Sequence, residues 1–187
     1  MDVAFINPFI CATRNVFDTM IQVPLVFGRP YLLPRETKVD TMYPISAAIG
    51  MSGSAVGLVV LSLSETVALA LASGLAKATF TQLNADSYDA LAEIINMIAG
   101  NAKKDLPGGQ TKLTVPTLLP TQDVVYPTGR PIITIPFDTG VGRFLISIAL
   151  RQNGVSSSRM APATAAAAAG GSTMIHDPPT APSEPTA

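Results

Sequence analysis

Few side chains in this sequence could carry out chemistry, and Glu93 and Asn96 are the strongest candidates among them. The only histidine, His176, lies in a C-terminal segment that we expect to be disordered. Ser-His-Asp and Cys-His mechanisms are therefore excluded from the folded part, as are histidine metal sites. The single cysteine, Cys11, has no histidine to activate it, and we interpret it as a small buried hydrophobe. What remains are mechanisms in which polar side chains position water.

Glu93 and Asn96 stand three positions apart in a segment whose apolar residues recur at helical spacing. We expect this helix to run from near Asn84 to about Asp105, where Pro107-Gly108-Gly109 stops it. On a helical wheel, the apolar stripe consists of Leu91, Ile94, Ile95, Ile98 and Ala102. The opposite side consists of Glu93, Asn96, Gly100 and Lys103. Residues three apart on a helix are surface neighbours, with β-carbons roughly 5–6 Å apart.

An ordinary solvated helix face is the alternative interpretation of this polar side, and the residues alone leave it open. Asparagine is mildly unfavourable inside a helix, and glycine costs about 1 kcal/mol relative to alanine. The presence of both Asn96 and Gly100 on one exposed face suggests a requirement other than stability. Gly100 would also leave room for the backbone of a partner to approach closely.

The rest of the sequence predicts an α+β fold with a mostly antiparallel sheet. Before the helix, the predicted elements are a helix from Asn7-Pro8 to about Met20, extended segments at 23–27 and 31–34, a hairpin over 45–63, and a helix opened by a capping box at 62–65 and ending near Lys77. After it, the predicted strands are 112–115, 132–137 and 143–150. Strands joined mainly by hairpins favour this fold class over a doubly wound one.

The uncharged run 41–64 is long enough to suggest a membrane span. Pro44 and the glycines of this run divide it into two strand-length apolar pieces around a Gly-Ser turn. A buried hairpin is therefore the preferred interpretation, and we expect no membrane association.

Composition narrows the class of protein further. The net charge is −1, and no basic stripe is present to neutralise a phosphate backbone, so we expect no nucleic-acid binding. We expect a folded domain at 1–151 and a disordered Ala-, Pro- and Ser-rich tail at 152–187, because the tail has no periodic apolar residues. The N-terminus has no basic signal-peptide region, which predicts a cytoplasmic protein.

The stretch from Ala92 to Ala102 resembles the Glu-x-x-Asn helix of the CheC/CheX/FliY phosphatases of bacterial chemotaxis. Three other segments resemble CheX members in particular: the opening 5–17, the turn at 50–53 with Gly57, and 135–137 with 142–144. Together they cover about residues 4–150 in the family's order. The resemblance implies an α/β sandwich with internal pseudo-twofold symmetry, in which two long helices pack on the sheet. Ala12 stands where a second Glu-x-x-Asn motif would have its glutamate, which implies a single site per subunit.

The function that the resemblance implies is hydrolysis of the phosphoaspartate on a CheY-like response-regulator receiver domain. In that mechanism Asn96 orients the attacking water and Glu93 pairs with a lysine of the receiver, while Met97, Gly100 and Lys103 border the contact. The chain would need no cofactor of its own, because the receiver would carry the Mg²⁺. The resemblance also implies a homodimer. A non-catalytic receiver-binding or flagellar-switch adapter is the alternative function.

Overall fold

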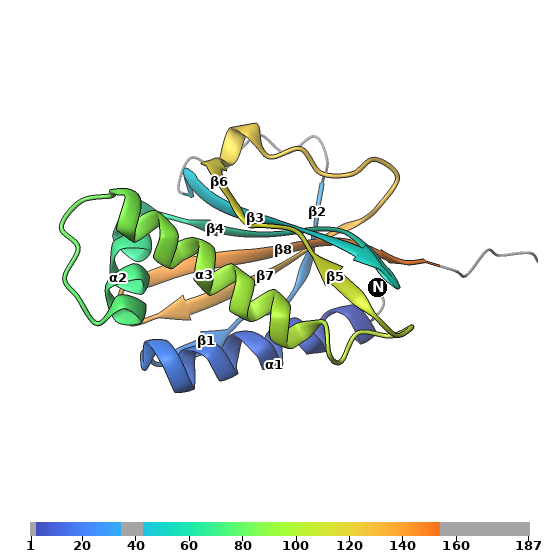
Figure 1. Cartoon of the computed structure of the whole chain (residues 1–187), viewed down its shortest axis with the longest axis horizontal. Coiled ribbons are helices and arrows are strands. Elements are labelled where there is room, and N and C mark those ends of the chain that lie inside the picture. Colours follow the sequence, from blue (N-terminus) through green and yellow to red (C-terminus); the bar gives the residue numbers. More distant parts are fainter. Residues whose placement is uncertain (1–2, 35–42, 154–187) are drawn as a thin grey trace, which may run out of the picture. The chain divides into compact units, whose positions relative to one another are not determined.

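The computed structural model describes residues 3–34 and 43–153. Within them the chain forms an eight-stranded sheet with three α-helices packed on it (Figure 1). The helices are α1 (Asn7–Val16), α2 (Glu65–Ala76) and α3 (Ala85–Ala102). The strands are β1 (Leu25–Phe27), β2 (Tyr31–Leu33), β3 (Ile45–Gly53), β4 (Ala55–Leu63), β5 (Thr111–Leu113), β6 (Thr117–Pro120), β7 (Ile132–Thr139) and β8 (Gly142–Gln152). The short helical turns are η1 (Val3–Phe5), η2 (Phe17–Ile21) and η3 (Thr121–Asp123).

The sheet has the order β1-β7-β8-β4-β3-β5, with β2 also paired to β7 and β6 also paired to β3. All of these pairings are antiparallel, which confirms the predicted fold class. The predicted 45–63 hairpin is β3 and β4, at the centre of the sheet. Among the described residues, no helix is long and apolar enough to cross a membrane.

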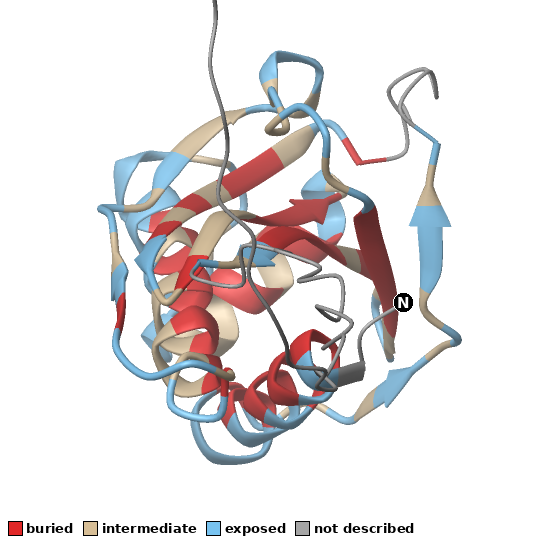
Figure 2. Ribbon diagram, turned by 90° about the vertical axis from the view of Figure 1, so that its right-hand side faces the viewer, coloured by how far each residue is buried: buried red, intermediate tan, exposed pale blue. Residues whose placement is uncertain are grey.

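The two faces of the sheet differ in chemistry because side chains alternate along each strand. On the helix-covered face, Leu61 of β4 lies between Ala47 of β3 and Ile146 of β8 in the register, and all three are fully buried. The other face carries buried hydroxyls that hydrogen-bond in pairs: Ser46 with Ser62, and Thr134 with Ser147, each at 2.9 Å. Pairing keeps these polar groups from costing free energy inside the fold. The apolar core therefore lies between the sheet and the helices (Figure 2).

The first helix is fixed to the sheet by aromatic packing. The ring of Phe17, at the start of η2, stacks on Phe144 of β8 at 5.3 Å between centroids, and Phe144 stacks on Phe137 of β7 at 5.2 Å. All three rings are fully buried. Because η2 continues α1, the helical segment runs from Asn7 to Ile21, close to the predicted extent.

The structure corrects the predicted helix starts. Asn7 is the first helical residue of α1 rather than its cap, because η1 leads directly into the helix and Ile6 takes the cap position. Ser64, not Ser62, caps α2, and its hydroxyl accepts a hydrogen bond from the Val67 amide. Ser62 instead belongs to β4, and its hydroxyl forms a hydrogen bond with the Ser46 hydroxyl. At Ser62, the pairing of β4 with β3 therefore outweighs the local capping pattern.

Other differences concern the strands and the ends of the described chain. β6 was not predicted, since it is short and contains a proline. The last two strands are interior to the sheet: β8 pairs with β4 and β7, and β7 pairs on its other side with β1 and β2. Gln152 ends β8 and Asn153 is the last described residue, so the tail predicted at 152–187 lies outside the described residues from 154 onward. The internal pseudo-twofold symmetry stays a prediction.

Candidate functional site

The candidate site lies on α3, which crosses in front of the sheet in Figure 1. The helix begins with a reciprocal capping box: the Asn84 side chain accepts from the Ser87 amide at 2.9 Å, and the Ser87 hydroxyl accepts from the Asn84 amide at 2.8 Å. A cap of this kind contributes typically about 1 kcal/mol. The predicted start at Asn84 is therefore confirmed, and the C-cap is Lys103.

The predicted apolar stripe of α3 is buried completely. Its members, Leu91, Ile94, Ile95, Ile98 and Ala102, each have 0% exposure. Glu93 on the opposite side is exposed, whereas Asn96, Gly100 and Lys103 are half-buried. The helical-wheel assignment of the polar face is thus confirmed.

Glu93 and Asn96 contact each other directly. The Asn96 Nδ2 donates a hydrogen bond to the Glu93 Oε2 at 3.3 Å. A carboxylate oxygen accepts, so the amide turns its nitrogen toward Glu93 and leaves its oxygen, Oδ1, for another donor. An exposed hydrogen bond of this length adds little to stability.

The other three predicted site residues surround this pair along the helix. A β-carbon built on Gly100 would meet nothing within 4 Å, so the surface beside the pair is open there. Met97 is half-buried and packs against the core at the flank of the polar face. Lys103 ends the helix, and its backbone amide donates to the Ala99 carbonyl at 3.0 Å. The structure thus places four of the five predicted residues within α3 and Lys103 at its C-cap.

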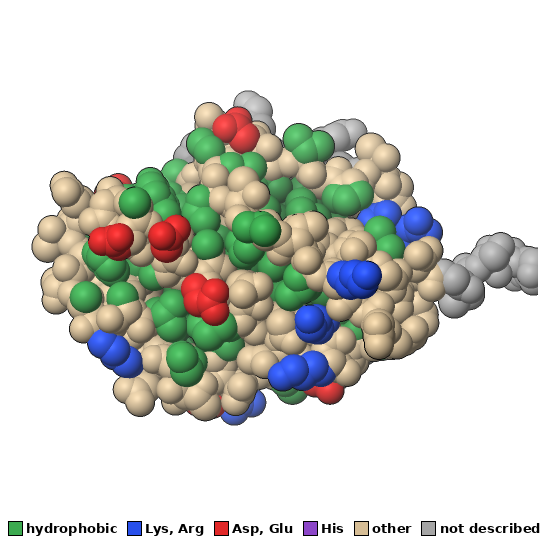
Figure 3. Space-filling model, viewed as in Figure 1, with side chains coloured by type: hydrophobic (Ala, Val, Ile, Leu, Met, Phe, Trp, Pro, Cys, Tyr) green, Lys and Arg blue, Asp and Glu red, His purple; other side chains and the backbone are tan. Residues whose placement is uncertain are grey.

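Charge is distributed unevenly along the exposed side of α3. Acidic side chains lie over its N-terminal half and basic ones near its C-terminal end (Figure 3). The acidic residues are Asp86, Asp89 and Glu93, and the basic ones are Lys103 and Lys104. This arrangement complements the helix dipole.

The neighbouring helix α1 carries the position that would complete a second site. Ala12 is buried at 5% exposure, whereas Asn15 is exposed. No carboxylate occupies the Ala12 position, so α1 cannot form a second Glu-Asn pair at Asn15.

Cys11, interpreted above as buried, is exposed, and that interpretation is wrong. The cysteine lies on the outer side of the amphipathic helix, which composition alone does not reveal.

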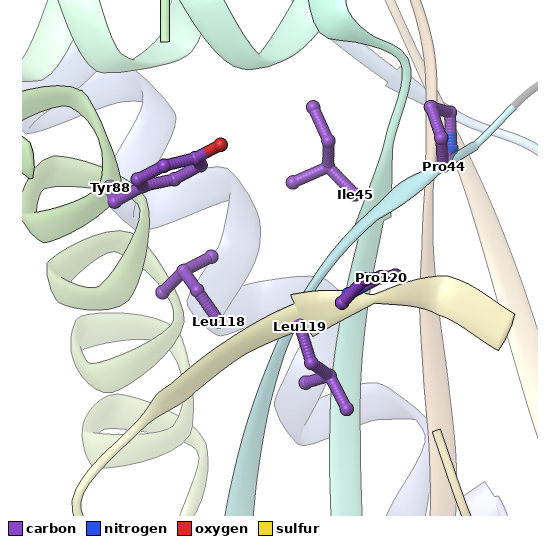
Figure 4. Close-up of a pocket in the computed structure, with 6 residues that line it drawn as sticks. All are labelled: Pro44, Ile45, Tyr88, Leu118, Leu119 and Pro120. Carbon is purple, nitrogen blue, oxygen red and sulfur yellow. The ribbon is translucent and has the colours of Figure 1, made fainter. Parts of the chain in front are cut away.

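Two features of the described residues bear on ligands. No group of three or more His, Cys, Asp and Glu side chains in 3–34 and 43–153 could hold a metal ion. A hollow of about 370 Å³ flanks α3 beside Tyr88, and sequence reasoning missed it. Its walls come from three separate elements (Figure 4).

Comparison with known proteins identifies the family. The model of the chemotaxis phosphatase CheX family matches residues 45–138, half of the chain, and this stretch includes Glu93 and Asn96. The protein therefore belongs to the CheX family of chemotaxis phosphatases. No curated protein matches the sequence.

Solved structures of similar fold agree with this assignment. A CheC-like superfamily protein from Shewanella sp. PV-4 is 26% identical, with a TM-score of 0.70, and the match covers 81% of this chain and 99% of that one. The chemotaxis protein CheX from Vibrio vulnificus is 26% identical, with a TM-score of 0.69 and coverage of 79% and 99%. The CheX of a CheX–CheY–BeF3–Mg²⁺ complex from Borrelia burgdorferi shares the fold at 23% identity, with a TM-score of 0.64 and coverage of 79% and 98%.

The open space at Gly100 leads to a prediction about stability. Replacing Gly100 with alanine should raise the free energy of unfolding by roughly 0.5–1 kcal/mol, because alanine favours a helix interior and here meets no neighbour. Urea denaturation followed by circular dichroism measures this. Gly74→Ala in α2 is the matched control, since its β-carbon would lie 2.9 Å from Ile21 and should not stabilise. A loss of stability in Gly100→Ala would contradict the described surface.

Proposed function

We propose that Glu93 and Asn96 carry the phosphatase activity of this CheX-family chain toward the phosphoaspartate of a CheY-like response regulator. The single observation that carries the proposal is the hydrogen-bonded Glu93–Asn96 pair on the exposed face of α3. It supports the proposal because the pair lies on a surface that a second protein can reach. Met97, Gly100 and Lys103 border the contact in this proposal.

Asn96 acts on the water in this mechanism. Phosphoryl transfer passes through a loose transition state, so the enzyme gains more from positioning the nucleophile than from a strong base. The Asn96 side-chain oxygen, which the bond to Glu93 leaves free, accepts a hydrogen bond from the water. This contact turns a lone pair of the water oxygen toward phosphorus. Holding the water in line with the breaking P–O bond lowers the entropic part of the barrier.

Glu93 acts on the receiver. Its carboxylate is exposed, and its bond to Asn96 occupies only one oxygen, so a cation on the receiver can reach it. A lysine beside the phosphorylated aspartate is the group we propose. The pair would then hold the receiver with its phosphoryl group over Asn96. In this proposal the Mg²⁺ belongs to the receiver. The two residues that this chain would bring to the reaction, Glu93 and Asn96, supply only one carboxylate and one amide.

We propose a cytoplasmic homodimer in which 1–151 is the phosphatase domain and 152–187 is a tail. The dimer would form through the outer edge of β1 and β2, which pair only with β7 among the described strands. This edge exposes apolar side chains, including Val26 at 67% and Leu32 at 53%. Exposed apolar edge strands readily pair with another chain.

Replacing Asn96 with alanine should lower kcat for dephosphorylation by tenfold or more, about 1.4 kcal/mol in the barrier, because the water loses its positioning group. The measurement is the decay of a phosphorylated receiver at saturating receiver concentration. Asn101→Ala, another half-buried asparagine of α3, is the matched control and should keep its activity. Wild-type kcat in Asn96→Ala would rule out this role.

Replacing Glu93 with alanine or glutamine should chiefly raise KM, because both changes remove the charge that meets the receiver. The glutamine variant keeps the size of the side chain, so it separates charge from shape. Glu65→Ala, an exposed glutamate in the first turn of α2, is the control. An unchanged KM in both Glu93 variants would count against docking through this carboxylate.

The dimer is tested by light scattering on the full chain. The wild type should have twice the mass of one chain, and Leu32→Lys should reduce it to one, since an edge lysine opposes strand pairing. Val141→Lys, an exposed apolar position in the β7–β8 turn, should leave the dimer intact. A monomeric wild type would contradict the dimer.

A further inference from the structure

The hollow beside α3 is an open apolar cleft of about 370 Å³. Tyr88 lines it from α3, Leu118 and Leu119 from β6, Ile45 from β3, with Pro44 and Pro120 at its far end (Figure 4). Tyr88 is 39% exposed, so its ring is a wall of the cleft rather than part of the core. The shape and lining suit one apolar side chain from another molecule.

The cleft lies close to the Glu93–Asn96 pair along the same helix. Tyr88 precedes Asn96 by eight residues, a rise of about 12 Å along the helix axis. A standard protein interface covers about 800 Å² of each partner, which corresponds to a patch of about 16 Å radius. A receiver centred on Asn96 therefore extends far enough along α3 to reach Tyr88, whose side chain points about 80° around the helix from that of Asn96. The cleft lies within reach of the partner that the proposed function requires.

The surroundings of the cleft indicate which part of the partner enters it. Asp86 and Asp89 are exposed on the same end of α3 as Tyr88. Neither forms an ion pair within the described part of the chain. On α3, Asp89 lies about 100° around the helix from Tyr88 and Asp86 about 160°, so Asp89 is the nearer carboxylate. A lysine or arginine next to an apolar side chain would complement Asp89 while the apolar side chain enters the cleft. The lysine end of α3, near Lys103 and Lys104, would disfavour the reversed orientation.

We propose that this cleft is a second docking point for the receiver, taking one of its exposed apolar side chains with an adjacent basic residue. The inference rests on the proposed function. It assigns Tyr88 a role in selecting the receiver, at a distance from the reacting phosphoryl group. Asp89 supports the same contact by charge. Because neither residue reaches the reacting atoms, both act on binding and not on the chemical step.

The test uses the full chain and a phosphorylated receiver at varied concentration. Tyr88→Ala should raise KM about tenfold and keep kcat within twofold, whereas Tyr88→Phe should match the wild type in both. Asp89→Asn should raise KM a few-fold at low salt and by less at high salt, because salt screens exposed charges. Val141→Ala, exposed at 48% in the β7–β8 turn, is the control and should change neither parameter. Thermal unfolding of each variant shows that the fold is intact.

The outcomes separate this inference from the proposed function. An unchanged KM in a folded Tyr88→Ala, with Asn96→Ala still slow, would overturn the cleft and leave the catalytic assignment standing. A fall in kcat alone would also overturn it. A wild-type protein that accelerates no receiver would overturn both.

Discussion

The complete burial of one stripe of α3 is the constraint on which the site depends. Leu91, Ile94, Ile95 and Ile98 have no exposed surface, so rotating the helix by one residue would bring a carboxylate or an amide into the core. Burying an unpaired polar group costs several kcal/mol. The helix therefore has one allowed rotation, and that rotation presents Glu93 and Asn96 outward. Packing that looks purely structural determines where the polar pair points.

The sheet contributes a platform rather than chemical groups. Its helix-facing side is apolar, and its other side satisfies buried hydroxyls such as Ser46 and Ser62 among themselves. In the proposed mechanism the site needs only one exposed helix, and the partner would supply the phosphoryl group and its metal ion. A surface of this kind, with an oriented amide at its centre, suits a reaction completed by two proteins together.

Local periodicity explains how much of the fold could be predicted. The α3 stripe repeats every three to four residues, and the central hairpin consists of two strand-length apolar pieces around a Gly-Ser turn, so both were predicted from sequence. Positions at which the local sequence pattern conflicts with the tertiary structure were not predicted correctly. Ser62 has the local pattern of a helix cap, yet it is part of strand β4. Cys11 was misplaced because its type favours burial while its place on α1 favours exposure. The cleft could not be predicted, since Ile45, Tyr88 and Leu118 meet only through tertiary packing.

A crystal structure of the full chain with a beryllofluoride-activated receiver would test whether the Glu93–Asn96 pair is the site of the reaction. We expect the exposed face of α3 to cover the receiver's active site. The Asn96 amide should lie within hydrogen-bonding distance of a water in line with the aspartyl–beryllium bond, and Glu93 should pair with a receiver lysine. A receiver bound to another face of the protein, with Asn96 still in contact with solvent, would contradict it.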